Sequence, residues 1–444
     1  MTSTPAWASL DATHVWHPYT QHAIAPAPIP IVRAAGAYLY DATGRPILDA
    51  ISSWWVTLHG HGHPIIAQAI ATQAHQLEQV IFAGFTHEPA ARLADELVAR
   101  LPKGLTRVFY SDDGSTAVEA ALKVALQYWS NRGQSRSLIA ALEHAYHGDT
   151  FGAMSAGARG VFTAPFHSHL FEVARLPDPT EGDTAAALRE VLERRGAQLA
   201  AVIVEPLLHG AGGMRVWDGA VLEQIRELTR AHDVLLIADE VLTGFGRTGP
   251  LFACERAQIV PDVMCLSKGI TGGFLPLGVT AVREEIFEAF RVADRTRTLF
   301  HGHSYTANPL ACAAARASLL LLDDSCAARR LSIETAHRAG LERLEQVPAV
   351  RRPRVLGTIA AFDLDGERSY LDPVGPAIAA HALEAGVLLR PLGNTVYILP
   401  PYCVTAEELG RVYEVVEESV VRVARIPSRA AQSAWPISST APRT

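Results

Sequence analysis

The sequence predicts an α/β protein in which a large domain, built around a mostly parallel sheet, is joined to a smaller α+β domain. The chain has 444 residues, and one hydrophobic core seldom grows beyond about 250–300 residues. Between residues 107 and 279, short apolar runs alternate with longer stretches of helical period. This alternation is typical of a parallel sheet covered by helices on both faces. Beyond residue 308 the order changes to helices followed by strands, which indicates a second unit.

The N-terminal part is predicted to contain a hairpin followed by helices. Within residues 35–50, the runs AYLYD and PILDA flank a turn that contains Gly44. A helix is predicted from Pro64 towards Val80, because proline suits the first turn of a helix. Apolar residues again recur at helical spacing over residues 93–101, which predicts a further helix there. Further strands are predicted at residues 107–110, 137–142, 199–204, 234–238, 263–266 and 277–279, and helices at residues 115–129, 186–195 and 220–232.

The last third is predicted to form the smaller domain. Helices are expected over residues 308–322 and around 334–344, followed by the strand-like runs IAAFDL, GVLLR and YILPPY and a final helix at 407–424. The segment from Ile426 is rich in Pro, Ser, Ala and Arg and is expected to be disordered. The predicted division is an N-terminal segment that contributes to the smaller domain and the active site, a large domain and a C-terminal small domain, at residues 1–57, 58–324 and 325–425.

The amino-acid composition limits the kinds of partner that the protein could bind and the cellular compartment in which it could work. Hydrophobic residues make up 49% and charged residues 19%, and the net charge is -7 with no concentrated Lys/Arg block, which argues against nucleic-acid and membrane partners. The five cysteines are scattered without CxxC spacing, so neither a disulfide framework nor a zinc cluster is predicted. Residues 1–21 lack the pattern of a secretory signal, and the apolar stretch 310–322 is too short to span a bilayer. We expect a cytoplasmic protein.

Two charged residues follow apolar strands of the predicted sheet. Asp239 ends the run LLIAD, at the edge where open α/β sheets bind ligands, and a buried acid there needs a partner. That partner could be a protonated pyridinium nitrogen. Alternatively, Asp239 could cap the loop that follows it or could pair with Arg247. Lys268 follows the run VMCL and precedes a glycine-rich stretch. It could be a desolvated, imine-forming nucleophile or an ordinary solvated lysine, whereas the spacing excludes a Walker phosphate loop.

Other polar residues lie in the loops between predicted strands and helices. Gly114 and Ser115 precede an alanine-rich helix, where free N–H groups suit a phosphate, although Ser115 could simply cap that helix. Tyr146 could stack on a flat ring, supported by His147 or Asp149, or could serve packing alone. No carboxylate or cysteine completes a metal site with the histidines of HGHGHP, so no metal is predicted. These three histidines are His59, His61 and His63.

In their order and spacing, these motifs resemble those of the class III (ω-amino-acid type) aminotransferases, which have the aspartate-aminotransferase fold, fold type I of the pyridoxal-phosphate enzymes. The motifs are DGSTAVEAALK, YHGDT, VEP, ADEV-TGFGRTG and SKG-TGG-LPLG, and the resemblance covers residues 11 to about 424. It implies pyridoxal 5'-phosphate as cofactor, with Lys268 as the Schiff-base lysine and Asp239 as the partner of the ring nitrogen. Gly114 and Ser115 are similar to the phosphate loop, and Tyr146 to the ring-stacking aromatic residue.

The resemblance also implies roles for residues that local patterns leave unassigned. Glu205 matches a family carboxylate near the active site; the alternative is an acid paired within the fold. Ser304 matches a hydroxyl that family dimers offer to the phosphate of the neighbouring subunit, which implies a homodimer with active sites at the subunit interface. Gly302, in the same HGHS stretch, is expected to bind substrate.

The runs WHPYTQ, SSWW and RPLGNTVYILPPY resemble one subfamily of these enzymes, which aminates a long-chain oxo acid. Such a substrate needs an apolar slot with a cation at its far end. Trp54 and Trp55 could form the walls, and Arg390 could bind the carboxylate bidentately; core packing and a structural ion pair are the alternatives. Three further side chains are expected around this pocket: Tyr19, which we place among the catalytic residues, Tyr397 and Arg247.

The amino donor is the part of the resemblance that stays open. The subfamily uses S-adenosylmethionine, and the double Trp and Tyr397 favour that donor. His303 and Ser304 stand where the best-known members have Pro-Thr, and HGHS is similar to relatives that use lysine. The remaining alternatives are another ω-amino-acid or diamine aminotransferase, a mutase or decarboxylase on the same scaffold, and a non-enzymatic binding protein.

Overall fold

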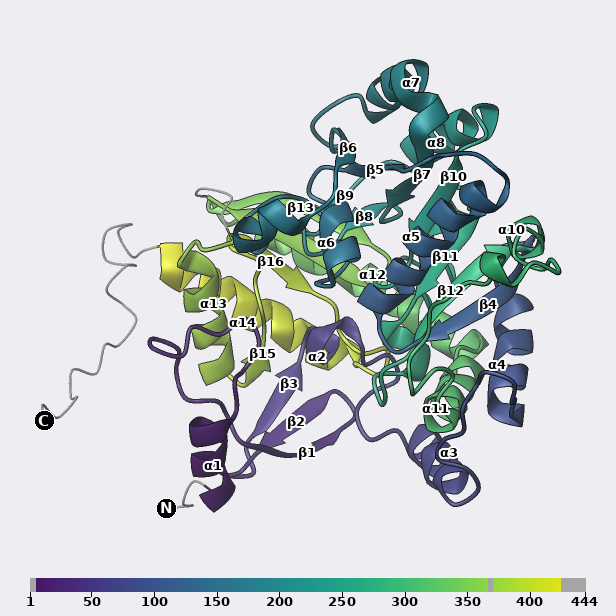
Figure 1. Cartoon of the computed structure of the whole chain (residues 1–444). Coiled ribbons are helices and arrows are strands. Elements are labelled where there is room, and N and C mark those ends of the chain that lie inside the picture. The colour runs from purple at the N-terminus through teal and green to yellow at the C-terminus, as the bar shows by residue number, and fades with distance from the viewer. Residues whose placement is uncertain (1–4, 366–369, 425–444) are drawn as a thin grey trace, which may run out of the picture.

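A seven-stranded sheet forms the centre of the larger part of the molecule in the computed structural model, which describes residues 5–365 and 370–424 (Figure 1). The strand order is β4-β12-β11-β10-β7-β5-β6. The strands are β4 (Leu105–Ser111), β5 (Leu138–Leu142), β6 (Val173–Leu176), β7 (Leu199–Val204), β10 (Leu235–Asp239), β11 (Val263–Leu266) and β12 (Gly278–Arg283).

Strand β12 is the exception to the parallel arrangement. The neighbouring pairs from β6 to β11 are parallel, whereas β12 is antiparallel to both β11 and β4. Parallel neighbours need a long crossover connection. Between β11 and β12 the chain forms only the short 3-10 helix η3 (Lys268–Thr271), so it turns back on itself. The predicted mostly parallel sheet is confirmed, with this one reversal.

Residues of each central strand alternate between two hydrophobic cores, because successive side chains point to opposite faces of a sheet. Ile237 of β10 belongs to the core beneath α5 (Gly114–Asn131), and its neighbour Leu236 belongs to the core on the other face. The other helices of this part are α3 (Pro64–Ala74), α4 (Glu88–Val98), α6 (Phe151–Ala156), α7 (Thr184–Arg195), α8 (Gly219–Ala231), α9 (Ala253–Arg256), α10 (Glu284–Glu288) and α11 (Pro309–Leu320). Because these strands are buried on both faces, almost all of their residues are apolar, which is the sequence pattern that predicts them.

The two ends of the chain share one small sheet. Its order is β1-β2-β3-β15, where β1 (Ile31–Ala35), β2 (Tyr38–Asp41) and β3 (Pro46–Asp49) come from the N-terminal part and β15 is Val387–Leu388. Val387 is aligned with Leu48 in a parallel pair. A second sheet contains β13 (Val350–Leu356), β14 (Ile359–Leu364) and β16 (Thr395–Ile398).

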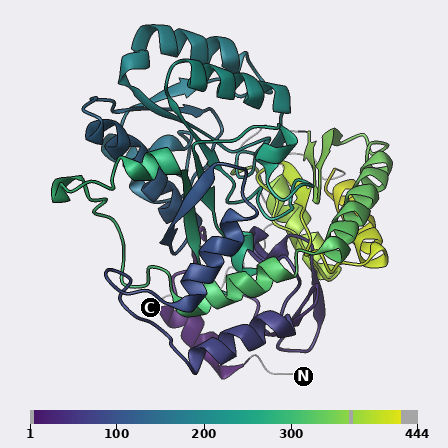
Figure 2. The ribbon, with the colours of Figure 1, turned by 90° about the vertical axis from the view of Figure 1, so that its right-hand side faces the viewer.

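Helices of the last third pack beside these sheets (Figure 2). They are α12 (Asp324–Leu344), α13 (Val374–Glu384) and α14 (Ala406–Ala424). The remaining elements are α1 (Ala6–His14), α2 (Ser52–Trp55), the strands β8 (Leu208–His209) and β9 (Arg215–Val216), and the 3-10 helices η1 (Ala164–His169), η2 (Gly196–Gln198) and η4 (Arg295–Arg297). None of the helices in the described chain has the length and apolar character that crossing a membrane requires.

Several element boundaries differ from the sequence-based expectation. The helix that begins at Pro64 ends at Ala74 instead of near residue 80, and the Gln73 side chain donates a hydrogen bond to the carbonyl of Leu77 just beyond it. Helix α12 begins at Asp324, ten residues earlier than its predicted core, where the Asp323 side chain accepts a hydrogen bond from the Cys326 N–H. Strands β6 and β13 and helix α13 were not predicted. The expected disorder from Ile426 lies outside the described residues.

Candidate active site

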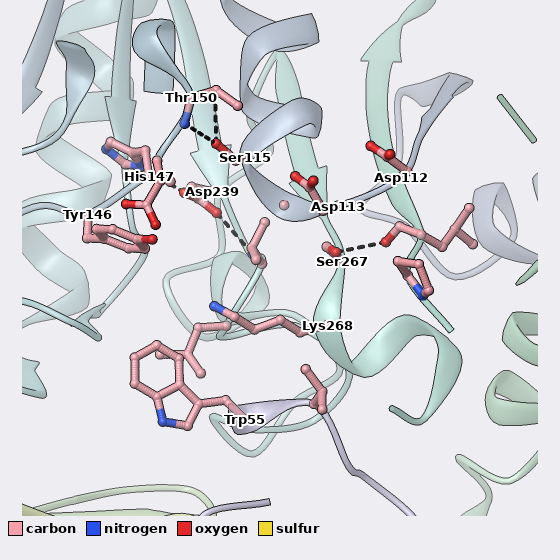
Figure 3. Close-up of a pocket in the computed structure, with 18 of the residues that line it drawn as sticks. Trp55, Asp112, Asp113, Ser115, Tyr146, His147, Thr150, Asp239, Ser267 and Lys268 are labelled. Carbon is pink, nitrogen blue, oxygen red and sulfur yellow. Dashed lines mark hydrogen bonds and ion pairs between the residues drawn. The ribbon is translucent and has the colours of Figure 1, made fainter. Parts of the chain in front are cut away.

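A cavity of about 730 Å³ opens at the carboxyl ends of the parallel strands, where open α/β sheets bind ligands. Its lining comes from the loops that follow five strands of the central sheet and from Trp55 in α2. Figure 3 shows how these side chains converge on one space. The lining includes Trp55, Gly114, Ser115, Tyr146, His147, Thr150, Glu205, Asp239 and Lys268.

Lys268 lies in this cavity directly after β11. Its backbone has a φ of 45°, the left-handed region that non-glycine residues seldom adopt, and the Ser267 hydroxyl donates to the carbonyl of Leu277 beside it at 2.7 Å. Burial lowers the pKa of Lys268 from its ordinary value, while the nearby carboxylates of Asp239 and Glu205 oppose the shift. Lys268 has no hydrogen bond or ion pair with any described protein group. Lys268 is partly buried and faces the cavity instead of the outer surface of the protein.

Asp239 ends β10 and is only 5% exposed. Its Oδ1 accepts a hydrogen bond from the N–H of Val241 at 3.1 Å, and its Oδ2 is 2.7 Å from Nδ1 of His147. Of the two residues that could support Tyr146, His147 bonds to Asp239 instead, whereas Asp149 contacts Tyr146. The Nε2 atom of His147 is buried and has no hydrogen-bond partner in the described chain.

The expected alternative of an Asp239–Arg247 pair is not formed. The Arg247 guanidinium donates to the carbonyls of Pro400 at 2.9 Å and of Trp55 and Thr57 at 3.3 Å. Its side chain is buried and does not line the cavity. Arg247 therefore lies beneath the cavity wall and joins parts of the chain, rather than facing a substrate as predicted.

Helix α5 directs its N-terminus at the cavity. Asp113 caps it, accepting a hydrogen bond from the Thr116 N–H at 2.8 Å, so the alternative that Ser115 is the cap is wrong. The Ser115 hydroxyl instead lies 2.7 Å from Oγ1 of Thr150 and accepts from the Thr150 N–H at 3.0 Å. A Cβ at Gly114 would lie 2.5 Å from Cγ1 of Val241, so only glycine fits there. The first N–H groups of a helix have no partner within it, which suits a bound anion.

Glu205 and Tyr146 form one side of the cavity. Oε1 of Glu205 accepts from the Tyr146 N–H at 2.8 Å, and Oε2 accepts from the Gly210 N–H at 3.0 Å. Burial raises the pKa of Glu205, and burial together with a hydrogen bond to Tyr19 raises the pKa of Tyr146. The carboxylate thus fixes the backbone that carries Tyr146 and also lines the cavity.

A cluster of aromatic residues and Arg390 adjoins the cavity. The Arg390 guanidinium lies over the Trp54 ring at 4.4 Å, and the ring of Tyr19 packs edge-on against Trp54 at 5.4 Å. The Tyr19 hydroxyl donates to Asp149, and burial and this bond raise its pKa to about 12. Trp55 donates from Nε1 to the hydroxyl of the buried Tyr397 at 3.0 Å. Tyr397 therefore supports Trp55 from behind.

Tyr19, Trp54, Arg390 and Tyr397 lie beside the cavity and, like Arg247, are not part of its lining. Two further predicted residues lie outside the lining as well. Gly302 and Ser304 are both exposed and do not line it. Conversely, sequence reasoning missed Thr150, which bonds to Ser115, and the contact of His147 with Asp239. Thr150 and His147 both belong to the YHGDT run, so the motif marked them as possible site residues. Their partners, Ser115 and Asp239, lie elsewhere in the chain, so the motif could not show these contacts.

The fold and the cavity together define the class of the protein, an enzyme that transfers amino groups. A family model described as aminotransferase class-III matches residues 19–420. The chain belongs to this class III aminotransferase family, and the fold predicted from the sequence is confirmed.

Named relatives are similar over almost the whole chain. A protein of Synechococcus elongatus named adenosylmethionine-8-amino-7-oxononanoate aminotransferase is 55% identical over 415 residues, which cover 91% of this chain and 98% of the relative. The crystal structure of the enzyme of that name from Methanocaldococcus jannaschii has a TM-score of 0.89 at 33% identity, covering 94% of this chain and 98% of the other. An amine transaminase from an uncultivated Pseudomonas species, in PLP-bound form, has a TM-score of 0.84 at 32% identity, covering 92% and 98%.

Proposed function

We propose that the protein transfers an amino group from S-adenosylmethionine to 8-amino-7-oxononanoate, giving the 7,8-diaminononanoate of biotin biosynthesis. The observation that carries this proposal is the Trp54–Arg390 stack next to the cavity that holds Lys268. An aromatic wall that leads to a cation suits an acceptor with a long apolar chain and a terminal carboxylate. The names of the similar enzymes from Synechococcus elongatus and Methanocaldococcus jannaschii support the same substrates.

Pyridoxal 5'-phosphate is the cofactor that we propose for the cavity. The residues fit it: Lys268 is unpaired among the described groups, Asp239 is a buried acid, and the N-terminus of α5 with Ser115 and Thr150 suits a phosphate. Bound there, the cofactor would supply an aldehyde that carries the amino group and a ring that takes up electrons released at the substrate carbon. Lys268 would hold the aldehyde, Asp239 the ring nitrogen, and Tyr146 one face of the ring.

The side chains of this protein then move and hold the protons. Because burial lowers the pKa of Lys268, its Nζ atom can be neutral and can accept the proton from the α-carbon of the donor. Asp239 would pair with the ring nitrogen, and its contact with His147 fixes its orientation. Trp55 packs against Lys268 and so covers one side of the amine.

Substrate selection follows from the cluster beside the cavity. We propose that Arg390 binds the carboxylate of the acceptor while Trp54 contacts its chain. Tyr19, hydrogen-bonded to Asp149, provides a hydroxyl at the same place and is the third proposed catalytic residue. Arg247 contributes indirectly, through the backbone of Trp55.

The assembly that we propose is a homodimer with active sites at the subunit interface. Exposed Gly302 and Ser304 then face the neighbouring cavity, where Ser304 contacts the phosphate and Gly302 the substrate. The compartment that we propose is the cytoplasm. All five cysteines are free, and four of them are buried, as suits a reducing environment.

The second candidate uses the same acceptor with lysine as donor, and the His303-Ser304 pair favours it. A half-reaction assay separates the two. The yellow enzyme is mixed separately with S-adenosylmethionine, lysine, β-alanine and 4-aminobutyrate, and loss of the yellow absorbance is recorded. We expect S-adenosylmethionine alone to bleach the enzyme. Bleaching by lysine would establish the second candidate, and bleaching only by β-alanine or 4-aminobutyrate would refute both.

A further inference from the structure

The segment that carries both tryptophans has an unusual backbone. Ser52, Ser53 and Trp55 have φ angles of 54°, 60° and 68°, in the left-handed region, although none is glycine. Such conformations persist only where the surrounding structure determines them. The contacts that hold residues 52–55 therefore decide where Trp54 and Trp55 lie.

Asp49 provides most of the contacts within this turn. Its side chain is fully buried, and its oxygens accept hydrogen bonds from the N–H groups of Ile51 at 3.1 Å and Ser53 at 2.6 Å. The Ser53 hydroxyl also donates to it at 3.2 Å, and Nε2 of His61 lies 2.8 Å away. Within the described chain, His61 is the only other titratable side chain within hydrogen-bonding distance of this carboxylate. A buried carboxylate with several donors imposes one geometry on them, because an unbonded donor there would be costly.

The turn places its two indoles on different functional groups. Trp55 lies over Lys268, with Nζ 4.7 Å from the ring centre. Trp54 contacts both Arg390 and Tyr19. A change in the backbone of Ser53 would move Trp54 most directly, because the two residues are adjacent.

We propose that Asp49, together with His61, is a positioning residue that holds the left-handed turn of residues 52–55 and thereby sets the binding of the oxo-acid acceptor. This inference rests on the proposed function, since it assigns Trp54 and Arg390 to the acceptor. Asp49 does not line the cavity, so it acts through the tryptophans and not on the reacting atoms. Its loss weakens acceptor binding more than it slows the transfer itself.

The test compares the cofactor-loaded enzyme with its Asp49→Asn variant. We expect the KM of the acceptor to rise about tenfold or more, as the loss of one or two buried charged hydrogen bonds implies, with kcat and the visible absorbance of the bound cofactor almost unchanged. Near-ultraviolet circular dichroism should change, because Trp54 moves, whereas Trp55 stays held by its hydrogen bond to Tyr397. Asp41→Asn is the matched control: Asp41 is a buried carboxylate that accepts from the N–H groups of Thr43 and Arg45 in the neighbouring turn. It should leave the KM unchanged.

Two further variants keep the test decisive. Ser53→Gly in the Asp49→Asn background should restore part of the acceptor affinity, because glycine adopts a left-handed φ without strain. If Asp49→Asn does not fold, His61→Gln removes one contact and should raise the KM in the same direction. An unchanged KM, or a loss of kcat and absorbance with the KM unchanged, would overturn the proposal. If the wild-type enzyme does not aminate this acceptor, the proposed function fails; the circular dichroism still reports whether Asp49 positions Trp54.

Discussion

The indole of Trp55 lies against Lys268, with the Nζ atom 4.7 Å from the centre of the ring. An aromatic face attracts a cation, and the carboxylates of Asp239 and Glu205 also favour the charged lysine, yet burial outweighs them and lowers the pKa. The amine is therefore easier to deprotonate than an ordinary lysine. Trp55 itself is fixed by Tyr397 and by Arg247, so the cover of the lysine is part of the rigid framework.

Replacement of Lys268 by alanine should abolish turnover, because no other described side chain could carry its amine into the cavity. The chain has only three lysines, Lys103, Lys123 and Lys268, so borohydride reduction of the yellow enzyme followed by peptide mapping has few candidate positions. We expect the label on Lys268 alone. Lys123→Ala, which removes a lysine that contacts His301 on the surface, is the control and should retain activity. Near-normal turnover by Lys268→Ala would refute the assignment.

Arg390→Ala should raise the KM of the oxo-acid acceptor by about 10- to 100-fold, the cost of a lost charged hydrogen-bonding partner. Bleaching by the amino donor should change much less, since Lys268 and Asp239 are untouched. Arg390→Lys should recover only part of the affinity, because an ammonium cannot bind a carboxylate in the bidentate manner. The measurement is steady-state kinetics with each substrate varied in turn. Equal losses for donor and acceptor would argue against an acceptor-specific role.

Asp178→Asn should destabilise the protein in a pH-dependent manner. The Asp178 and His209 side chains are both 0% exposed, with Oδ2 and Nδ1 2.9 Å apart. Burial raises the pKa of Asp178, but hydrogen bonds from His209 and Thr180 outweigh it and hold the pKa well below its usual range. The carboxylate therefore stabilises the fold fully above the unfolded-state pKa of about 3.9, and this contribution disappears as the pH falls below that value.

At neutral pH the expected cost of Asp178→Asn is about 2–3 kcal/mol, and it should shrink below pH of about 4. Thermal unfolding midpoints at several pH values measure it. Glu190→Gln serves as the control, because Glu190 is 65% exposed and pairs with Arg194 only at 3.6 Å. If the loss of stability of Asp178→Asn is the same at every pH, the charge of Asp178 does not contribute, and only the packing of its side chain does.

Mixed dimers test the shared active site. If Ser304 serves the neighbouring cavity, a Lys268→Ala subunit paired with a Ser304→Asp subunit forms one fully wild-type site, because the intact lysine and the intact serine meet across the interface. Each variant alone should be nearly inactive, since aspartate repels the phosphate. Mixing, unfolding and refolding the two should restore up to half of the wild-type activity per heterodimer. No recovery would place Ser304 and Lys268 at one site of the same subunit, and normal activity of the Ser304→Asp variant alone would deny Ser304 a role.

The central residues of the site could be predicted because they follow strands directly. Asp239 ends β10 and Lys268 is the second residue after β11, and neighbouring parallel strands bring their carboxyl ends together. Ser115 shows the limit of local patterns: it and Asp113 are both good caps, and only the position of Thr150 in another loop separates their roles.

Arg247 could not be placed from the sequence, because its partners are backbone carbonyls and not side chains. It bonds to the carbonyls of Trp55, Thr57 and Pro400, which lie far from it along the chain. A motif that places an arginine near a site does not say which way the guanidinium points. The reversal of β12 was likewise not visible in its apolar run; it follows from the length of the connection after β11.

The pairing of β3 with β15 has a consequence for synthesis on the ribosome. The two strands come from opposite ends of the chain, and contacts of such large sequence separation form late. The central sheet, with Lys268 and Asp239, is complete well before β15 leaves the ribosome. The turn that carries Trp54 and Trp55 follows β3, so it acquires the support of β15 only at the end of translation. A chain truncated before β15 would contain the catalytic pair and both tryptophans, but neither that support nor Arg390.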